Sequence, residues 1–178
     1  MSKSKNILFQ LSGSIACYKA CSAISKLVQR GHEVKAVCTP AALKFIGEAT
    51  LEGLTRKPVY CDMFERKTGL EHISLNKWAD VSVVCPATAD VISKMAAGIG
   101  DDCVTTLFLS HDFKKPFLVA PAMNVNMWNH PATRRSVETL RQWGVKIIEP
   151  GAGYQACGDE GRGRLSEPEE IVSAAEAA

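Results

Sequence analysis

The sequence has 178 residues, of which 46% are hydrophobic, 22% charged and 7% aromatic. This length and composition allow one domain with a buried core, and they exclude disordered, collagen-like and coiled-coil proteins. Because 21 Lys and Arg face 19 Asp and Glu, the formal net charge is only +2. We therefore expect no broad electrostatic binding of nucleic acid or of an acidic membrane surface.

In chain order, the hydrophobic pattern alternates between short apolar runs and segments of helical periodicity. We expect a strand at 6–11, a helix at 16–28, a strand at 33–38, a helix at 41–48, a strand at 81–85, helices at 89–97 and 103–109, a strand at 117–120, a helix at 131–144, a strand at 145–148 and a helix at 167–178. Short apolar strands that alternate with helices predict a mostly parallel sheet covered on both faces. The fold class is thus α/β, a single doubly wound, Rossmann-like domain over residues 1–178.

Two segments depart from this alternation. Residues 61–78 are polar and rich in turn-forming residues, which predicts an irregular loop. Residues 149–164 carry five glycines, and so many glycines disfavour a long regular element because of their entropic cost. We expect a mobile flap or hairpin at about 149–165, and no second domain.

Seven cysteines, an odd number, are spread along the chain without a C-x-x-C pair, which argues against a zinc site or any other metal. Cys38 and Cys85 lie in apolar runs typical of buried strands, so we interpret most thiols as core residues of a reduced, cytoplasmic protein. The apolar N-terminal run is interrupted by Gln10 and Ser12 and followed by Lys19, unlike a signal peptide. No segment has the length of a membrane span.

Loops that follow parallel strands are candidate ligand sites. The first of them, residues 12–15, places small side chains and free backbone N–H groups at a helix N-terminus, which suits a phosphate. It lacks G-x-G-x-x-G and G-K-[ST], which disfavours a dinucleotide or a triphosphate and leaves a mononucleotide such as FMN, or a simple turn. The loop at 86–90 offers similar groups, and there N-capping is the plainer interpretation.

The loop at 121–128 is unusual because it packs two amides, two thioethers and an indole into eight residues. A buried Asn124 would need hydrogen-bonding partners, which a ligand carboxylate or amide could supply. Cys157 differs from the other thiols because it lies in the glycine-rich segment, where it could reach a ligand or be an incidental loop cysteine.

Of the four histidines, His72 is the one candidate for chemistry. It lies in the irregular segment, where an imidazole could act as acid, base or anion contact, although a lone histidine is more often structural. His32 and His111 have ordinary surface settings. His130 is explained by its place between Asn129, the expected N-cap, and the N1 proline Pro131.

The segment P-A-M-N-V-N-M-W at 121–128, together with A-C-G-D-E-G-R-G-R-L-S-E-P-E-E-I at 156–171, resembles the phosphopantothenoylcysteine decarboxylases, within the homo-oligomeric flavin-containing Cys decarboxylase family. G-S-I-A near the N-terminus, H-I-S-L-N-K-W-A-D at 72–80 and P-A-T-A-D at 86–90 follow in the family's order. The resemblance therefore covers the chain from Lys5 to Ile171.

The resemblance implies FMN-dependent decarboxylation of 4'-phosphopantothenoyl-L-cysteine to 4'-phosphopantetheine in coenzyme A biosynthesis, by thiol oxidation, loss of CO2 and re-reduction of an enethiol. By position in the motifs, His72 would assist thiol deprotonation, Asn124 would bind the substrate carboxylate, and Cys157 would donate a proton. Met127 matches a further substrate-binding position. The positions that match FMN contacts are Gly13, Ser14, Ile15, Thr39, Ala41, Thr88, Ala89, Asp90 and Ala122.

The resemblance also implies a homotrimer or homododecamer whose active site lies at a subunit interface. Relatives commonly carry Asn in place of Asp90, and a carboxylate there could weaken cofactor binding or find another partner. Many relatives continue into a second domain, so the chain is either free-standing or half of a bifunctional protein. The alternatives are a peptidyl-cysteine decarboxylase that stops at the enethiol, an inactive flavin-binding regulatory subunit and a flavin prenyltransferase.

Overall fold

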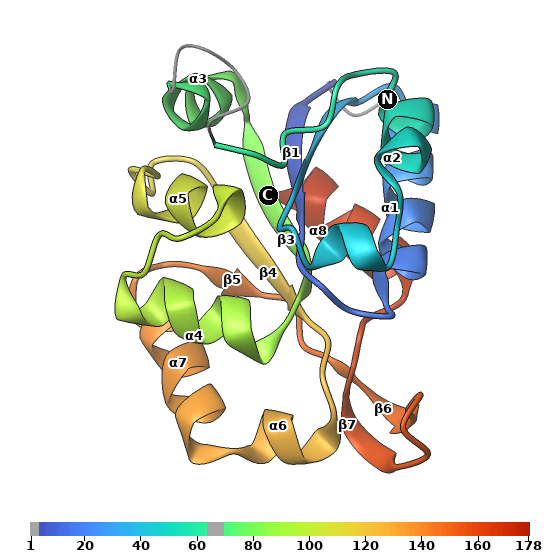
Figure 1. The fold of residues 1–178 in the computed structure, drawn as a ribbon, viewed down its shortest axis with the longest axis vertical. Helices are drawn as coiled ribbons and strands as arrows, with labels where there is room; N and C mark the ends of the chain where they lie inside the picture. Colours follow the sequence, from blue (N-terminus) through green and yellow to red (C-terminus); the bar gives the residue numbers. More distant parts are fainter. Residues whose placement is uncertain (1–3, 64–69) are drawn as a thin grey trace.

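The computed structural model describes residues 4–63 and 70–178, and it is built around one five-stranded sheet (Figure 1). The strand order is β2-β1-β3-β4-β5, and all four pairings are parallel. The strands are β1 (Asn6–Leu11), β2 (Glu33–Cys38), β3 (Val81–Ala87), β4 (Phe117–Pro121) and β5 (Lys146–Ile147). The predicted α/β class is confirmed, and the pairing is parallel throughout this sheet.

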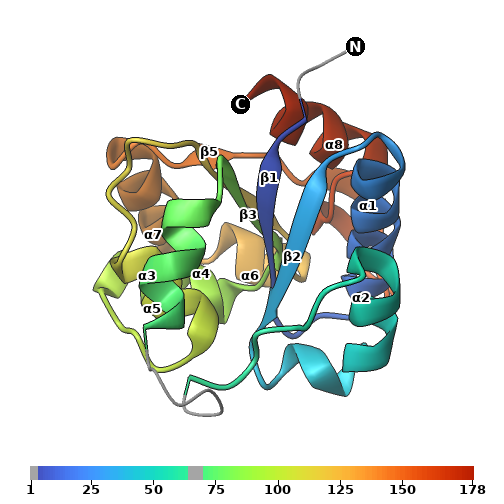
Figure 2. The same cartoon turned by 90° about the horizontal axis from the view of Figure 1, so that it is seen from above.

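Helices cover both faces of the sheet (Figure 2). One face carries α1 (Cys17–Gln29), α2 (Glu48–Thr55) and α8 (Pro168–Ala177), and the other carries α3 (Glu71–Trp78), α4 (Ala89–Ala97), α5 (Cys103–Leu109) and α7 (Pro131–Gln142). Successive side chains of a strand point to opposite faces. Accordingly, Ile7 and Phe9 of β1 pack into a first core, on the side of α1, α2 and α8. Leu8 packs into a second core, on the side of α4, α5 and α7.

The helix predicted at 41–48 is wrong in position. A short 3-10 helix occupies Ala42–Lys44, and α2 begins only at Glu48. The Oγ1 of Thr39 accepts the N–H of Ala42 at 3.2 Å and closes the first turn. Gly47 is extended (φ −74°, ψ 149°), so the helical path is interrupted between the two segments.

The irregular loop predicted at 61–78 is also wrong in its second part, because α3 occupies Glu71–Trp78; residues 64–69 lie outside the described residues. No side chain of α3 is fully buried, so its sequence lacks the apolar stripe by which a helix is recognised. The partly buried Leu75 and Trp78 pack against the core, and polar contacts also hold the helix. Asn76 Nδ2 donates to a carbonyl of α5 at 2.9 Å, and the Lys115 ammonium binds carbonyls at the C-terminal end of α3.

The glycine-rich segment 149–165, called the flap from here on, contains an antiparallel hairpin. Its strands are β6 (Gly151–Tyr154) and β7 (Glu160–Arg164), which form a sheet of their own. Of the two predicted alternatives, the hairpin is therefore what the structure shows. Figure 1 places it beyond the end of the main sheet, next to the segment that follows β4.

The loop predicted at 121–128 contains a short helix, α6 (Val125–Asn129), that begins directly after Asn124. The next helix is capped by His130 and not by Asn129 as predicted. His130 Nδ1 accepts the N–H of Ala132 at 3.2 Å, which leaves Asn129 as the last residue of α6.

None of the seven cysteines forms a disulfide bond, in agreement with the expectation of reduced thiols. Cys38 and Cys85 are fully buried in β2 and β3, and burial raises the pKa of both thiols above the ordinary range. Within the described residues, no helix combines the length and the apolar character needed to cross a bilayer.

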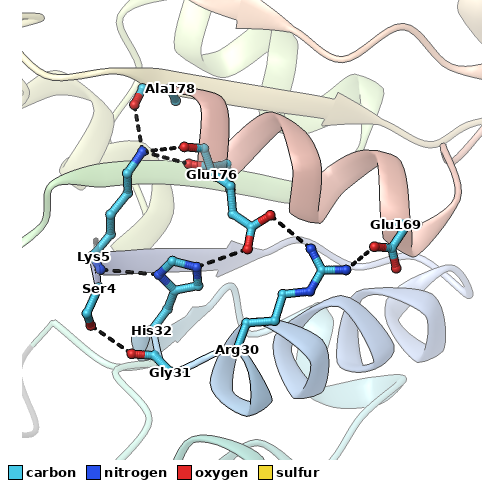
Figure 3. A network of polar contacts seen from close by, with 9 residues as sticks. Ser4, Lys5, Arg30, Gly31, His32, Glu169, Glu176 and Ala178 are labelled. Atoms are coloured by element: carbon cyan, nitrogen blue, oxygen red, sulfur yellow. Dashed lines mark hydrogen bonds and ion pairs between the residues drawn. The ribbon is translucent and has the colours of Figure 1, made fainter. Parts of the chain in front are cut away.

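His32 and His111, expected at the surface, are buried, with only 3% and 8% of their surfaces exposed. Figure 3 shows how His32 joins the two ends of the chain. Its Nδ1 accepts the backbone N–H of Lys5 at 3.2 Å, so its Nε2 carries the hydrogen and donates to Glu176 of α8 at 3.2 Å. Arg30 also donates to Glu176, at 2.8 Å, which ties the end of α1 to α8.

His111 lies between α5 and β4, among aromatic rings. Its ring meets Phe113 and Phe117 edge to face, with centroids 5.2 and 5.1 Å away. Its Nδ1 accepts the N–H of Phe113 at 3.0 Å. Burial lowers the pKa of His111 below its ordinary value of 6.5, because the charged imidazolium would lose its hydration.

This burial makes stability depend on pH. With the folded pKa below 6.5, the unfolded chain binds the proton first, so the contribution of His111 is complete above pH 6.5 and is lost as pH falls through the lowered value. We expect His111→Gln, which stays neutral, to flatten the decline in the free energy of unfolding below pH 6.5. Urea unfolding of both proteins over this range measures the slope, and equal slopes would contradict the expectation.

Candidate active site

The loops after β1 and β3 are tied together at the carboxyl edge of the sheet by Ser12, which is buried. Its Oγ donates to the carbonyl of Pro86 at 2.6 Å and accepts the N–H of Thr88 at 2.9 Å. The strand order turns between β1 and β3, the position where open parallel sheets bind ligands. The sequence did not single out Ser12, because a small hydroxyl in a loop looks the same whether it bonds to protein or to ligand.

A first cavity of about 510 Å³ opens at this edge. Six of the predicted site residues line it, namely Gly13, Thr39, Ala41, Thr88, Asp90 and Met127. Gly13 lies so close to Ala41 that an added Cβ would stand 2.7 Å from the Cβ of Ala41. Thr88 Oγ1 accepts the N–H of Val91 at 3.3 Å, so the predicted N-cap of α4 is confirmed.

Asp90, whose carboxylate was expected to disturb cofactor binding, is paired with a cation. Its carboxylate lies 3.3 Å from Lys94 Nζ, which also lies 3.1 Å from Asp101. These hydrogen bonds raise the pKa of Lys94, that to Asp101 most, so Lys94 stays charged at the cavity wall. Small loops and the N-terminus of α4 therefore meet around this cavity, beside a lysine that is paired with two carboxylates. The backbone N–H groups of these loops fit the phosphate of a mononucleotide.

A second cavity of about 320 Å³ lies on the other side of the loop that follows β1. It is lined by Asn124 and Cys157, the predicted catalytic amide and thiol, and by Ser14, Ile15 and Ala122. The loop between β1 and α1 thus contributes to both cavities, and the predicted cofactor contacts are divided between them. Met127 lines the first cavity and not the second, and Ala89 lines neither.

Asn124 is oriented by its own backbone. Its Oδ1 accepts the N–H of Asn126 at 2.7 Å and caps α6, so its Nδ2 must point the other way, toward the flap. There Nδ2 lies 2.6 Å from Asp159 Oδ2 and 3.2 Å from Cys157 Sγ. The thiol and the Asp159 carboxylate are themselves 3.4 Å apart, so an amide, a thiol and a carboxylate form one cluster. Asp159 was missed, although it lies two positions beyond Cys157.

The cluster holds together because the base of the flap is fixed against the chain around Asn124. Met123 N–H donates to the carbonyl of Gly163 at 2.9 Å, and Val125 N–H donates to Gln155 Oε1 at 3.0 Å. Gly163 has a φ of +133°, and a Cβ there would lie 2.5 Å from the carbonyl oxygen of Met123. Two backbones can approach this closely only because Gly163 has no side chain.

Two cations of the second cavity share one carboxylate outside the cluster. Lys19 and Arg164 both line the cavity, and both contact Glu167, at 2.8 and 2.9 Å. The hydrogen bond from Lys19 lowers the pKa of Glu167, so the carboxylate remains ionised between the two cations.

His72 is not brought to this cluster within one chain. It is half-buried in the first turn of α3, which packs against α5 and β1, and it lines neither cavity. Figure 1 shows α3 and the hairpin at opposite ends of the molecule. The assignment of His72 to the active site therefore stays a prediction, because within one chain His72 does not lie at the cluster.

The fold and the paired cavities define an α/β protein with a candidate ligand site at the switch point of a parallel sheet. All 178 residues match the family model described as Flavoprotein, and the chain belongs to this family. It is 47% identical over 178 residues to the coenzyme A biosynthesis bifunctional protein CoaBC of Bacillus subtilis, a match that covers 99% of this chain and 43% of that protein. The chain thus spans less than half the length of this relative.

Solved structures give the same relationship. A cysteine-to-serine mutant of PPC decarboxylase, complexed with pantothenoylaminoethenethiol, matches with a TM-score of 0.86 and 34% identity, covering 97% of this chain and 96% of that chain. The FMN binding protein AtHal3 matches with a TM-score of 0.85 and 35% identity, covering 97% and 95%.

The close approach at Gly163 predicts a strong effect of a single methyl group. Gly163→Ala would place Cβ against the Met123 carbonyl in a left-handed conformation, so we expect the free energy of unfolding to fall by about 2 kcal/mol. We also expect faster proteolysis of the flap. Gly151→Ala is the matched control, because the nearest atom to its added Cβ is 3.8 Å away. Equal stability of the two variants in urea would contradict the fixed base of the flap.

Proposed function

We propose that the chain is an FMN-dependent phosphopantothenoylcysteine decarboxylase, which converts 4'-phosphopantothenoyl-L-cysteine to 4'-phosphopantetheine and CO2 in coenzyme A biosynthesis. The observation that carries the proposal is the cluster of Asn124 and Cys157 at the second cavity, directly beside the first cavity at the switch point of the sheet. The relatives named for coenzyme A biosynthesis, PPC decarboxylase and FMN binding support the substrate and the cofactor.

We assign the FMN site to the loops around the first cavity and the loop it shares with the second. Gly13, Ser14 and Thr88 would face the cofactor with small side chains and backbone N–H groups, and the charge of Lys94 is balanced by Asp90 and Asp101. When bound, FMN would accept a hydride during oxidation of the substrate thiol and later return it. The pairing of Asp90 with Lys94 supports retention of the cofactor despite the carboxylate.

Asn124 would hold the substrate carboxylate, because its Nδ2 already points into the cavity as a hydrogen-bond donor. A carboxylate on a carbon next to an amide nitrogen has no electron sink of its own. Oxidation of the thiol to a thiocarbonyl supplies one, since the electrons of the breaking C–C bond can then move onto sulfur. Asn124 would keep that bond aligned with the sink.

Cys157 would return the proton in the last step. The enethiolate left by loss of CO2 needs one hydride and one proton at its carbon atoms to become the product thiolate, and a second proton on sulfur to become the thiol. The hydride and the sulfur proton were both given up in the oxidative step, so the net reaction replaces CO2 by one proton. Cys157 lies on the flap over the cavity, 3.2 Å from the amide that would hold the carboxylate. In support, the related PPC decarboxylase mutant that lacks a cysteine holds an ethenethiol.

His72 would act from a neighbouring protomer, in a homotrimer or a homododecamer. We propose that its imidazole takes the proton of the substrate thiol in the oxidative step. Apolar side chains exposed around the second cavity, Ile15, Tyr18 and Tyr154, support a covering protomer, because they are 60%, 64% and 74% exposed in one chain. A cytoplasmic location fits seven cysteines that form no disulfide bond.

The reaction itself is tested by mass spectrometry of the products. We expect the FMN-loaded protein to convert the cysteine substrate to 4'-phosphopantetheine, and Cys157→Ser to stop at the enethiol, which is lighter by two hydrogen atoms. The reason is that serine donates a proton far less readily than cysteine. If the unaltered protein releases the enethiol as its final product, the result supports a peptidyl-cysteine decarboxylase and contradicts the proposed function.

The shared site is tested by mixing variants. His72→Asn should retain FMN but lose thiol oxidation, because no base takes the thiol proton. Hetero-oligomers assembled from His72→Asn and Cys157→Ser chains should regain formation of 4'-phosphopantetheine, since some sites then combine an intact His72 with an intact Cys157. Failure to regain the product in verified mixed oligomers would contradict the contribution of His72 from a neighbour.

A further inference from the structure

The carboxylate of Asp159 accepts a hydrogen bond from the Asn124 amide, the group that the proposed function assigns to the substrate carboxylate. Its Oδ2 lies 2.6 Å from Asn124 Nδ2, the shortest of the contacts within the cluster. The amide cannot turn away, because its Oδ1 is held by the N–H of Asn126 at 2.7 Å. A carboxylate of the protein therefore sits on the donor where a carboxylate of the ligand would have to bind.

The charge of Asp159 is not compensated by the cations of the cavity. Lys19 and Arg164 both contact Glu167 instead, and no ion pair of Asp159 is found in the part of the chain that the structure describes. Its partners there are the Asn124 amide and the Cys157 side chain, neither of which is a cation. An exposed carboxylate without a cationic partner is held weakly and can be displaced by a competing carboxylate.

The side chain can leave without disturbing the flap. The turn that carries Asp159 is closed by backbone bonds, from Gln155 N–H to the carbonyl of Asp159 at 2.8 Å and from Gly158 N–H to the carbonyl of Gln155 at 3.0 Å. The base of the flap is held separately, at Gly163. A rotation about the side-chain bonds of Asp159 is enough to free the amide.

We propose that the carboxylate of Asp159 takes the place of the substrate carboxylate in the free protein, where it accepts the hydrogen bond of the Asn124 amide. The carboxylate of the incoming substrate displaces it, and Asp159 binds the amide again when the substrate carboxylate has left as CO2. The inference rests on the proposed function and adds a residue that sets specificity. The product has no carboxylate, so Asp159 competes with substrate and not with product.

The test compares two unreactive ligands on FMN-loaded protein by calorimetry. Both are 4'-phosphopantothenoyl amides with a hydroxyl in place of the thiol, one formed from serine and the other from ethanolamine, so they differ only in the carboxylate. We expect Asp159→Ala to lower Kd for the serine ligand about three- to fivefold, the worth of one exposed charged contact, and to leave Kd for the ethanolamine ligand unchanged.

Two controls separate this role from a general effect of charge or structure. Glu160→Ala removes the same charge one residue further along, and we expect it to leave the ratio of the two Kd values unchanged. In an Asn124→Ala background, Asp159→Ala should no longer change the ratio, because the contested donor is gone.

An Asp159→Ala protein with the same Kd ratio as the unaltered protein, or with weaker binding of the serine ligand, would overturn the inference. So would an equal change in Glu160→Ala. Failure of the unaltered protein to decarboxylate its substrate would instead contradict the proposed function, so the two failures are distinguishable.

Discussion

The parallel pairing of β1 with β3 is the constraint on which the site depends. Parallel strands end at the same edge, so the loops that leave β1 and β3 emerge side by side. Ser12 then locks the two loops together through the carbonyl of Pro86 and the N–H of Thr88. Because the hydroxyl of Ser12 is buried, its hydrogen bonds must be made within the protein. These bonds fix the two loops that line the first cavity.

Two separate contacts position the groups of the second cavity. Asn124 uses one end of its amide to cap a helix, which leaves the other end free to donate. Gly163 lets the flap approach the backbone next to Asn124, which brings Cys157 and Asp159 over that donor. A ligand group at this amide meets a donor whose direction is set before binding, so less conformational entropy is lost on association.

The two termini are joined far from the cavities. Lys5 donates from its ammonium to the carbonyls of Glu176 and Ala178, at the C-terminal end of α8, where a cation complements the helix dipole (Figure 3). His32 and Arg30 reach the same helix through the Glu176 carboxylate. This network holds α8 over the first core and leaves the opposite, carboxyl edge of the sheet to the ligand.

The amino-acid sequence by itself predicted the strands of the main sheet and most helices, and it singled out Asn124 and Cys157 as candidates. It left residues 149–165 open between a mobile flap and a hairpin. Apolar periodicity and turn residues act over a few positions, so they can be interpreted without the fold. Tertiary structure decided the burial of His32, whose partner Glu176 is 144 residues away. It likewise decided the existence of α3, which has no fully buried side chain and is held by partly buried residues and by polar contacts to distant segments. It also decided the role of Asp159, since only the packing of the flap brings that carboxylate to an amide 35 residues away.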